Sequence, residues 1–228
     1  MSAARPPEDA DQRSEAAQRQ ARVHRAGLAF ADVSGAALRD FHDARVADPH
    51  WAQATTPLQA DGVWHWIEAN HRFNSLLWDE EDLARRVDVD DAQIAANKRV
   101  IDACNQKRND AVERIDEALL ARIEQVAAID GAWHNSETAG AMIDRLSILA
   151  LKIFHMGREA HRDDATDAQR ASWRERHRLL QVQRADLARC FDTLLRAAAE
   201  GRAYWRIYRQ FKMYNDPALN PYLRGKRR

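Results

Sequence analysis

Apolar residues recur every three or four positions through most of this 228-residue chain, which is the period of an α-helix with one buried face. No run alternates apolar and polar residues for long enough to predict a strand. No proline occurs between Leu58 and Asp216, so this whole block is open to helix. Four glycines fall where helices are expected to begin or end: Gly62, Gly131, Gly140 and Gly201.

The pattern predicts a short helix over Gly35–Val46 and four long helices. The long helices are expected over about Val63–Arg86, Asp90–Ala128, Thr138–His161 and Asp167–Ala199. A shorter helix with many aromatic residues is expected over Ala203–Tyr214. The third long helix is apolar nearly all round in its middle, which predicts a central, buried position. The fold class is therefore expected to be all-α, an antiparallel four-helix-type bundle with short flanking helices.

Composition divides the chain further. Residues 1–20 are polar and lack a repeating apolar face, so they are expected to be a disordered N-terminal segment. The bundle domain is expected to cover residues 21–201. Residues 202–228 hold eight Lys or Arg against one acid and form a basic, aromatic C-terminal extension. The chain has 35 basic residues (Lys and Arg together) and 35 acidic residues (Asp and Glu together), so its net charge does not point to a polyanionic partner.

Targeting and redox signals are few. No run reaches the roughly 18 apolar residues of a membrane span, and no apolar signal segment follows the N-terminus. Cys104 and Cys190 do not form a paired motif, so no disulfide or zinc framework is expected. These features predict a soluble, cytoplasmic protein without a membrane partner. Nucleic acid is a disfavoured partner of the basic end, and an unpaired seam of the bundle could serve a homo-oligomer.

Polar residues occupy one face of the first long helix where a core-facing stripe would be expected. The stripe consists of His71, Asn74, Trp78, Glu81, Asp82 and Arg85. At about 100° per residue these positions fall within an arc of about 100°. Such a stripe is either solvated or part of a buried network, and a buried network is costly unless all its members are paired.

Two further helices repeat this pattern. Asn105, Arg108 and Asn109 interrupt an otherwise apolar heptad in the second long helix. The third long helix carries Asp144, Arg145, Lys152, His155 and Glu159 within a similar arc. Helical bundles build ligand and metal sites from facing helices in this way. We therefore expect these stripes to share one polar pocket.

Two kinds of chemistry suit these side chains. The first is attack on a phosphate-type substrate, for which the carboxylates and imidazoles are suitable ligands of a divalent metal cofactor. Glu80-Glu81 and Glu113 to Asp116 resemble part of the magnesium-binding pattern of all-α nucleoside triphosphate pyrophosphohydrolases. Ala84 and Arg85, however, stand where that pattern has a further Glu. The second is recognition without a metal, in which the same groups close a salt-bridge network or bind a small anionic ligand.

Three sequence elements add a resemblance. Asn74 to Asp82 reads Asn-x-x-Leu-Trp-x-x-Glu-Asp, and Arg108-Asn109 follows. The segment from Asn135 to Leu149 contains Asn-x-Glu-Thr-x-Gly and Asp-Arg-Leu-Ser-Ile-Leu. Together these elements resemble a family of bacterial proteins, domain-of-unknown-function family 4254. The resemblance brings no assigned activity, but members are often associated with glycosyltransferase and cell-surface sugar genes, which implies a nucleotide-sugar or glycan context.

The expected function is an enzyme that acts on a phosphate- or nucleotide-sugar-type small molecule. The alternative is a non-catalytic ligand-binding or assembly module of a cell-surface glycan gene cluster. The candidate catalytic residues are His71, Glu81, Asp82, Asp144, His155 and Glu159. The candidate substrate-binding residues are Asn74, Trp78, Arg85, Asn105, Arg108, Asn109, Arg145 and Lys152.

Overall fold

The computed structural model describes residues 28–48, 50–54, 57, 61–211, 213 and 216–223, and its architecture is all-α, as the periodicity predicts. The predicted disordered segment, residues 1–20, lies outside the described residues. The helices are α2 (Gly35–Val46), the single 3-10 turn η1 (Trp51–Gln53), α3 (Gly62–Leu83), α4 (Asp91–Ala121), α5 (Ala139–Glu159) and α6 (Asp167–Ala199).

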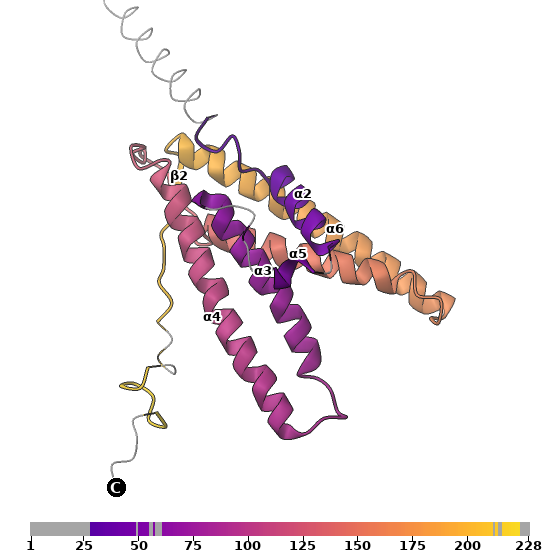
Figure 1. Ribbon diagram of the computed structural model, residues 1–228. Helices are drawn as coiled ribbons and strands as arrows, with labels where there is room; N and C mark the ends of the chain where they lie inside the picture. Colours follow the sequence, from indigo (N-terminus) through magenta and orange to yellow (C-terminus); the bar gives the residue numbers. More distant parts are fainter. Residues whose placement is uncertain are drawn as a thin grey trace, which may run out of the picture.

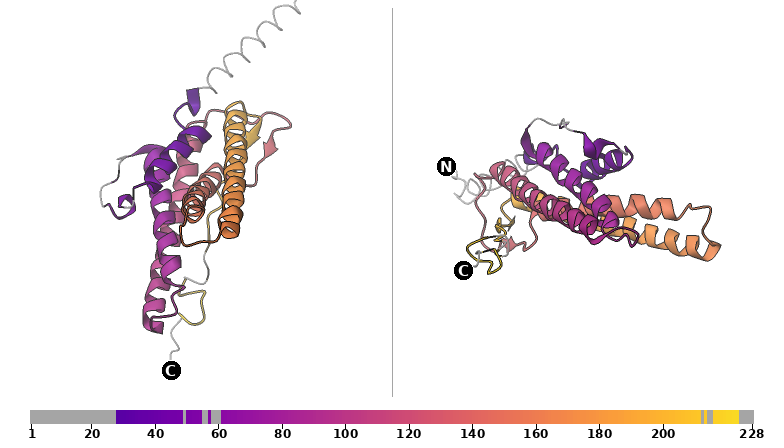
Figure 2. Two further views of the ribbon diagram at one scale, coloured as in Figure 1. Left: turned by 90° about the vertical axis from the view of Figure 1, so that its right-hand side faces the viewer. Right: turned by 60° about the horizontal axis from the view of Figure 1, so that its bottom comes forward.

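The four long helices are arranged as two antiparallel hairpins, one made of α3 and α4 and the other of α5 and α6. The hairpins cross, and their connecting turns point in different directions (Figures 1 and 2). Helix α5 is the central element because it packs against α2, α3, α4 and α6. The short helix α2 lies against α5 and α6.

Side-chain caps explain where the helices begin. The Thr138 side chain accepts a hydrogen bond from Ala141 N and so starts α5. The Asp90 side chain does the same for α4 by accepting from Gln93 N. Helix α6 begins with a capping box in which Thr166 and Gln169 bond each other's backbone.

The apolar core has two parts. The main cluster fills the region where the hairpins cross, and its fully buried members include Leu38, Ile67, Ile115, Ile143 and Phe191. A smaller cluster lies farther along the α3–α4 hairpin and contains Leu77, Ile101 and Cys104. The polar residues discussed below therefore lie among side chains that exclude water.

The predicted helix over Ala203–Tyr214 is wrong. Ala203–Tyr204 is instead a strand, β2, which pairs in parallel with β1 (Trp133–His134), and the chain from 205 to 211 has no regular structure. Residues 203 and 205 are buried, whereas residues 206 and 208 are exposed. This alternation has the period of two that is typical of extended chain, and the helical interpretation overlooked it.

None of the helices that the structure describes combines the length and the apolar character needed to cross a membrane.

Candidate functional site

The innermost polar side chains of α3 and α5 hydrogen-bond to one another where the two helices cross. Asn70 and Asn74 donate through Nδ2 to the same atom, Asp144 Oδ1, at 2.8 and 2.9 Å. Asn74 Nδ2 also lies 2.9 Å from Ser147 Oγ, to which it donates. The asparagines and Ser147 are buried, whereas the Asp144 side chain keeps 16% exposure. The two amides compensate the carboxylate for much of its lost hydration.

His71 extends this network toward α2. Its Nδ1 lies 2.7 Å from Ser147 Oγ. The Ser147 hydroxyl oxygen also accepts from Asn74, so this contact joins the imidazole to the asparagines of the network. Burial lowers the pKa of His71 to about 3, Arg45 lowers it further, and the backbone of His42 opposes the shift. The imidazole is therefore neutral at pH 7.

Helix α4 contributes a guanidinium and an amide to the same network. Arg108 Nε lies 3.9 Å from Asp144 Oδ1, and Arg108 Nη2 donates to Asn109 Oδ1 at 3.2 Å. Asn109 Nδ2 in turn donates to Gln210 Oε1 at 2.9 Å. The network thus connects α3, α5 and α4 with the segment that follows β2. Most of its polar groups bond to one another, although Arg108 Nε is buried without a hydrogen-bond partner.

A pocket of about 310 Å³ lies next to this network, between the end of α2, η1, α3 and α5. Trp51 lines the pocket and also stacks on His71, with ring centroids 5.3 Å apart. Phe154 supplies a second aromatic wall. The polar side chains that line it are Asp48, Gln53, Ser75, Asp79, His155 and Arg158. A volume of this size lies at the lower end of small-molecule sites.

His155 and Asp79 give this pocket an acid–base character. The His155 ring stacks on Trp78 at 4.4 Å with an interplanar angle of 11°, which fixes its orientation. Burial, followed by the charge of Arg158, lowers the pKa of His155, so its imidazole is neutral at pH 7. Burial raises the pKa of Asp79, and His155 opposes this shift. A neutral imidazole beside a carboxyl group that holds its proton more strongly can accept and return a proton.

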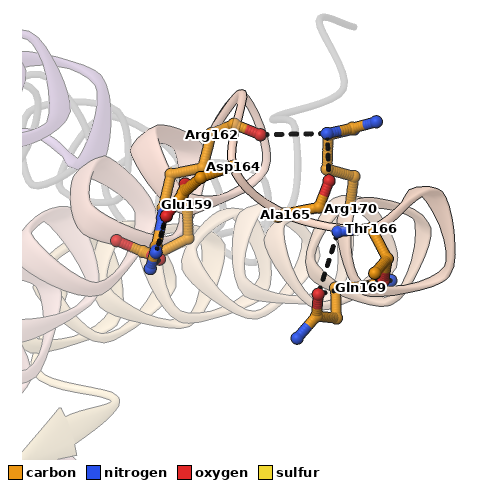
Figure 3. A network of polar contacts seen from close by, with 7 residues as sticks. All are labelled: Glu159, Arg162, Asp164, Ala165, Thr166, Gln169 and Arg170. Carbon is orange, nitrogen blue, oxygen red and sulfur yellow. Dashed lines mark hydrogen bonds and ion pairs between the residues drawn. The ribbon is translucent and has the colours of Figure 1, made fainter.

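Several predicted site residues lie on the surface instead. Glu81 and Arg85 pair with each other at 2.9 Å, with 46% and 68% of their side chains exposed. Asp82 is exposed. Glu159 pairs with Arg162 at 2.8 Å at the turn between α5 and α6, where Figure 3 shows the surrounding contacts. Exposed pairs of this kind contribute little to stability and offer no enclosed site.

The remaining predicted site residues also divide into exposed residues and residues of the interior. Arg145 pairs with Glu137 at 2.7 Å and is exposed, as is Lys152, while Asn105 is half-buried. The structure thus brings together the inner part of the stripes, namely His71, Asn74, Arg108, Asn109 and Asp144. His155 lines the neighbouring pocket, and Trp78 stacks on it. The exposed residues of the stripes belong neither to the network around Asp144 nor to the lining of the pocket.

The sequence interpretation missed several residues that the geometry brings forward, among them Trp51 and Arg158 of the pocket. Asn70 and Ser147 complete the network around Asp144. Asn70 lies one helical turn before Asn74, so helical spacing could have found it. Ser75 and Asp79 follow His71 at four-residue intervals on the side of α3 that lines the pocket. Helical spacing therefore relates these residues to His71, but they lie on a face of α3 beside the predicted polar stripe.

A further polar contact fixes the start of α5 against α4. Asp116 Oδ1 accepts a hydrogen bond from Gly140 N at 2.8 Å. Burial raises the pKa of Asp116 to about 6, although hydrogen bonds from Thr138, Gly140 and Trp205 oppose the shift. A Cβ atom on Gly140 would lie 2.5 Å from the backbone oxygen of Val112, so only glycine permits this close approach.

Among the residues that the structure describes, no three His, Cys, Asp or Glu side chains come together in a way that could hold a metal ion.

One family model matches the chain. Its description is "Protein of unknown function (DUF4254)", and the match covers residues 64–207. That range covers α3 from Trp64 onward and all of α4, α5 and α6, and it therefore contains every member of the network around Asp144 except Gln210. No curated protein and no solved structure matches the chain.

Proposed function

The chain belongs to the DUF4254 family, and we propose that it is an enzyme that binds a small sugar phosphate in the pocket around His155. The observation that carries this proposal is the combination of side chains in one pocket of about 310 Å³. Arg158 offers a cation for a phosphate group, and Phe154 offers an aromatic wall for a sugar ring. Asp48 and Asp79 are acceptors for sugar hydroxyl groups.

The volume of the pocket around His155 limits the size of the ligand. A pocket of about 310 Å³ suits a single sugar ring with its phosphate better than a complete nucleotide sugar. The charges point the same way, because Asp48 and Asp79 disfavour a ligand that is phosphate alone. A ligand with hydroxyl groups for the carboxylates and one anionic end for Arg158 matches both features.

His155 is the proposed general base. Its neutral imidazole accepts a proton from a ligand hydroxyl, and the stack on Trp78 limits the rotation of the ring. The network around Asp144 is a positioning element in this proposal. It fixes α3 against α5, and these two helices carry Asp79 and His155.

Titration calorimetry with four probes tests the binding step: hexose 1-phosphate, hexose 6-phosphate, free hexose and inorganic phosphate. We expect a hexose phosphate to bind the wild-type protein more tightly than free hexose or phosphate does. Arg158→Gln should weaken this binding about tenfold or more, which corresponds to the loss of a charge-assisted hydrogen bond. Arg174→Gln, which removes an exposed arginine of α6, is the matched control and should bind like wild type.

Turnover is tested separately, because His155→Gln should retain binding and lose activity. Phosphorus NMR of the bound hexose phosphate over time follows any change at or near the phosphate. Equal affinity of wild type and Arg158→Gln for all four probes would refute the proposed site.

A non-catalytic role is the second candidate, and one observation favours it. The groups around Asp144 are bonded to one another, so they fit a specificity network in a ligand-binding or assembly module as well. Such a module would also suit the cell-surface glycan context. Hexose phosphate binding without turnover, unchanged in His155→Gln, would select this alternative.

A further inference from the structure

The chain from residue 202 to residue 211, called the extended segment below, alternates inward and outward side chains after α6 ends. Trp205 belongs to the main core cluster and is 3% exposed. Tyr204, Arg206 and Tyr208 occupy the alternate positions, which places them on the outer side of the segment. The helix that the sequence predicts here would dock on the bundle through its rings. The extended chain instead turns two aromatic rings and a guanidinium away from the core.

The outer rings gather around His134 of β1. His134 stacks on Tyr204 with ring centroids 4.9 Å apart and an interplanar angle of 7°. The Tyr208 ring lies 6.4 Å from the same imidazole, and the Arg206 guanidinium lies 5.8 Å from the centre of the Tyr204 ring. Tyr208 remains 59% exposed, and Phe211, three residues farther along, is 87% exposed. Exposed apolar groups that gather in one place mark a binding surface.

Hydrogen bonds at two points hold the extended segment in place. Asn135 N, just after β1, donates to Tyr204 O at 2.9 Å. Farther along, Arg209 pairs with Glu113 of α4 at 2.6 Å, and Gln210 N donates to the same carboxylate at 3.2 Å. A surface that is fixed before its ligand arrives loses less conformational entropy on binding.

The charges of this surface favour an anionic partner. The extended segment contains three arginines and no acidic residue, and the side chain of Arg206 is exposed. Three acids line the small cavity next to Tyr208. Glu113 and Glu137 each pair with an arginine, and Asp116 is buried. A phosphate group can therefore approach Arg206 without breaking an ion pair between described residues.

We propose that His134, Tyr204, Arg206 and Tyr208 form a surface that binds single-stranded nucleic acid. Unpaired bases stack on exposed aromatic rings, whereas the bases of a duplex are already stacked on one another. Arg206 contacts a backbone phosphate, and residues 212–228 add five Lys or Arg against one acid. None of the four residues lines the proposed sugar phosphate pocket, so this proposal is independent of the proposed function.

Fluorescence anisotropy of the full chain with labelled oligouridine and oligothymidine, each of about 12 nucleotides, tests this surface. A DNA duplex of the same length and polyphosphate, which has charge but no bases, are the comparison probes. We expect a single strand to bind more tightly than the duplex or polyphosphate at the same salt concentration. Equal affinity for all probes would overturn the proposal and assign the attraction to the charge of the basic end alone.

Two pairs of variants separate stacking from charge. Tyr208→Ala should weaken single-strand binding about five- to hundredfold, whereas Tyr208→Phe keeps the ring and should bind like wild type. Arg206→Gln should reduce the slope of log affinity against log salt concentration by about 0.7, which corresponds to one phosphate contact on a single strand. Arg174→Gln makes the same change of net charge on the exposed side of α6 and should leave the slope unchanged.

Ultraviolet crosslinking of oligouridine to the wild-type chain, followed by mass spectrometry of the peptides, gives a readout that needs no variant. The proposal expects crosslinks at His134 or within residues 204–211. Crosslinks confined to other parts of the chain, or single-strand binding that is the same in wild type and Tyr208→Ala, would overturn it. If Tyr208→Ala fails to fold, the crosslinked positions alone decide.

Discussion

Replacing Asp116 by asparagine is expected to stabilise the protein at alkaline pH. Asp116 is buried between α4 and the start of α5, and its pKa is raised from 3.8 to about 6. The folded state therefore binds this proton more tightly than the unfolded state does. The cost of ionising Asp116 in the folded state is absent below pH 3.8, grows between the two pKa values and is complete above pH 6. Asparagine keeps an oxygen for Gly140 N and cannot ionise.

The size of the effect follows from the shift. A rise from 3.8 to about 6 corresponds to about 3 kcal/mol at pH 8, since one unit of pKa is about 1.4 kcal/mol. The same relation gives about 0.5 kcal/mol at pH 4. The amide offers one acceptor oxygen where the carboxylate has two, so 3 kcal/mol is a ceiling. We expect a gain of about 1–3 kcal/mol at pH 8 that nearly disappears at pH 4.

Urea unfolding followed by circular dichroism at both pH values measures this difference. Asp163→Asn, which changes an exposed carboxylate before α6, is the control and should shift stability by less than about 0.5 kcal/mol at either pH. If Asp116→Asn lowers stability by the same amount at pH 8 and pH 4, the charged hydrogen bonds of Asp116 outweigh its burial, and the reasoning fails.

Three further predictions concern the same region. The pKa of His71 is lowered to about 3 in the folded state, so only the unfolded state takes up this proton as the pH falls below 6.5. Wild type should therefore lose about 2 kcal/mol of stability relative to His71→Asn between pH 8 and pH 5, as measured by urea unfolding. Asp144→Ala leaves the amide of Asn74 without its carboxylate partner and should cost about 2–4 kcal/mol, whereas a loss below about 1 kcal/mol would show that the network is not cooperative. Gly140→Ala should lower Tm sharply, because its Cβ would lie 2.5 Å from a backbone oxygen of α4. The control Gly157→Ala, whose Cβ would lie 3.3 Å from the nearest atom, should lower Tm much less. Equal Tm values for both variants would contradict the close approach at Gly140.

The positions of the four long helices were the part of the fold that the sequence predicted well, although the second of them ends at Ala121 and not near Ala128. The Asp167–Ala199 helix agrees at both ends, because Thr166 caps it and Gly201 adopts the left-handed φ of +75° that ends it. The crossing of the two hairpins was not predictable in the same way. It depends on which faces of α5 meet α2 and α4, and an apolar stripe does not specify its partner helix.

The site was predictable only in its inner part. Helical spacing placed Asn74 and Asp144 on inward faces, and the two side chains do meet. The same spacing could not separate Glu81 from them, although Glu81 lies farther along α3, where it pairs with Arg85 on the surface. An angle on a helical wheel carries no information about position along the axis. The pocket around His155 also depends on Trp51, which comes from a separate turn that no periodicity connects to α5.

A crystal structure of the full chain soaked with the hexose phosphate that binds most tightly would test the central claim most directly. The proposed function predicts the phosphate beside Arg158, the sugar ring against Phe154, and a hydroxyl group within hydrogen-bond distance of His155. Density for the ligand at another place, with this pocket unchanged, would contradict it.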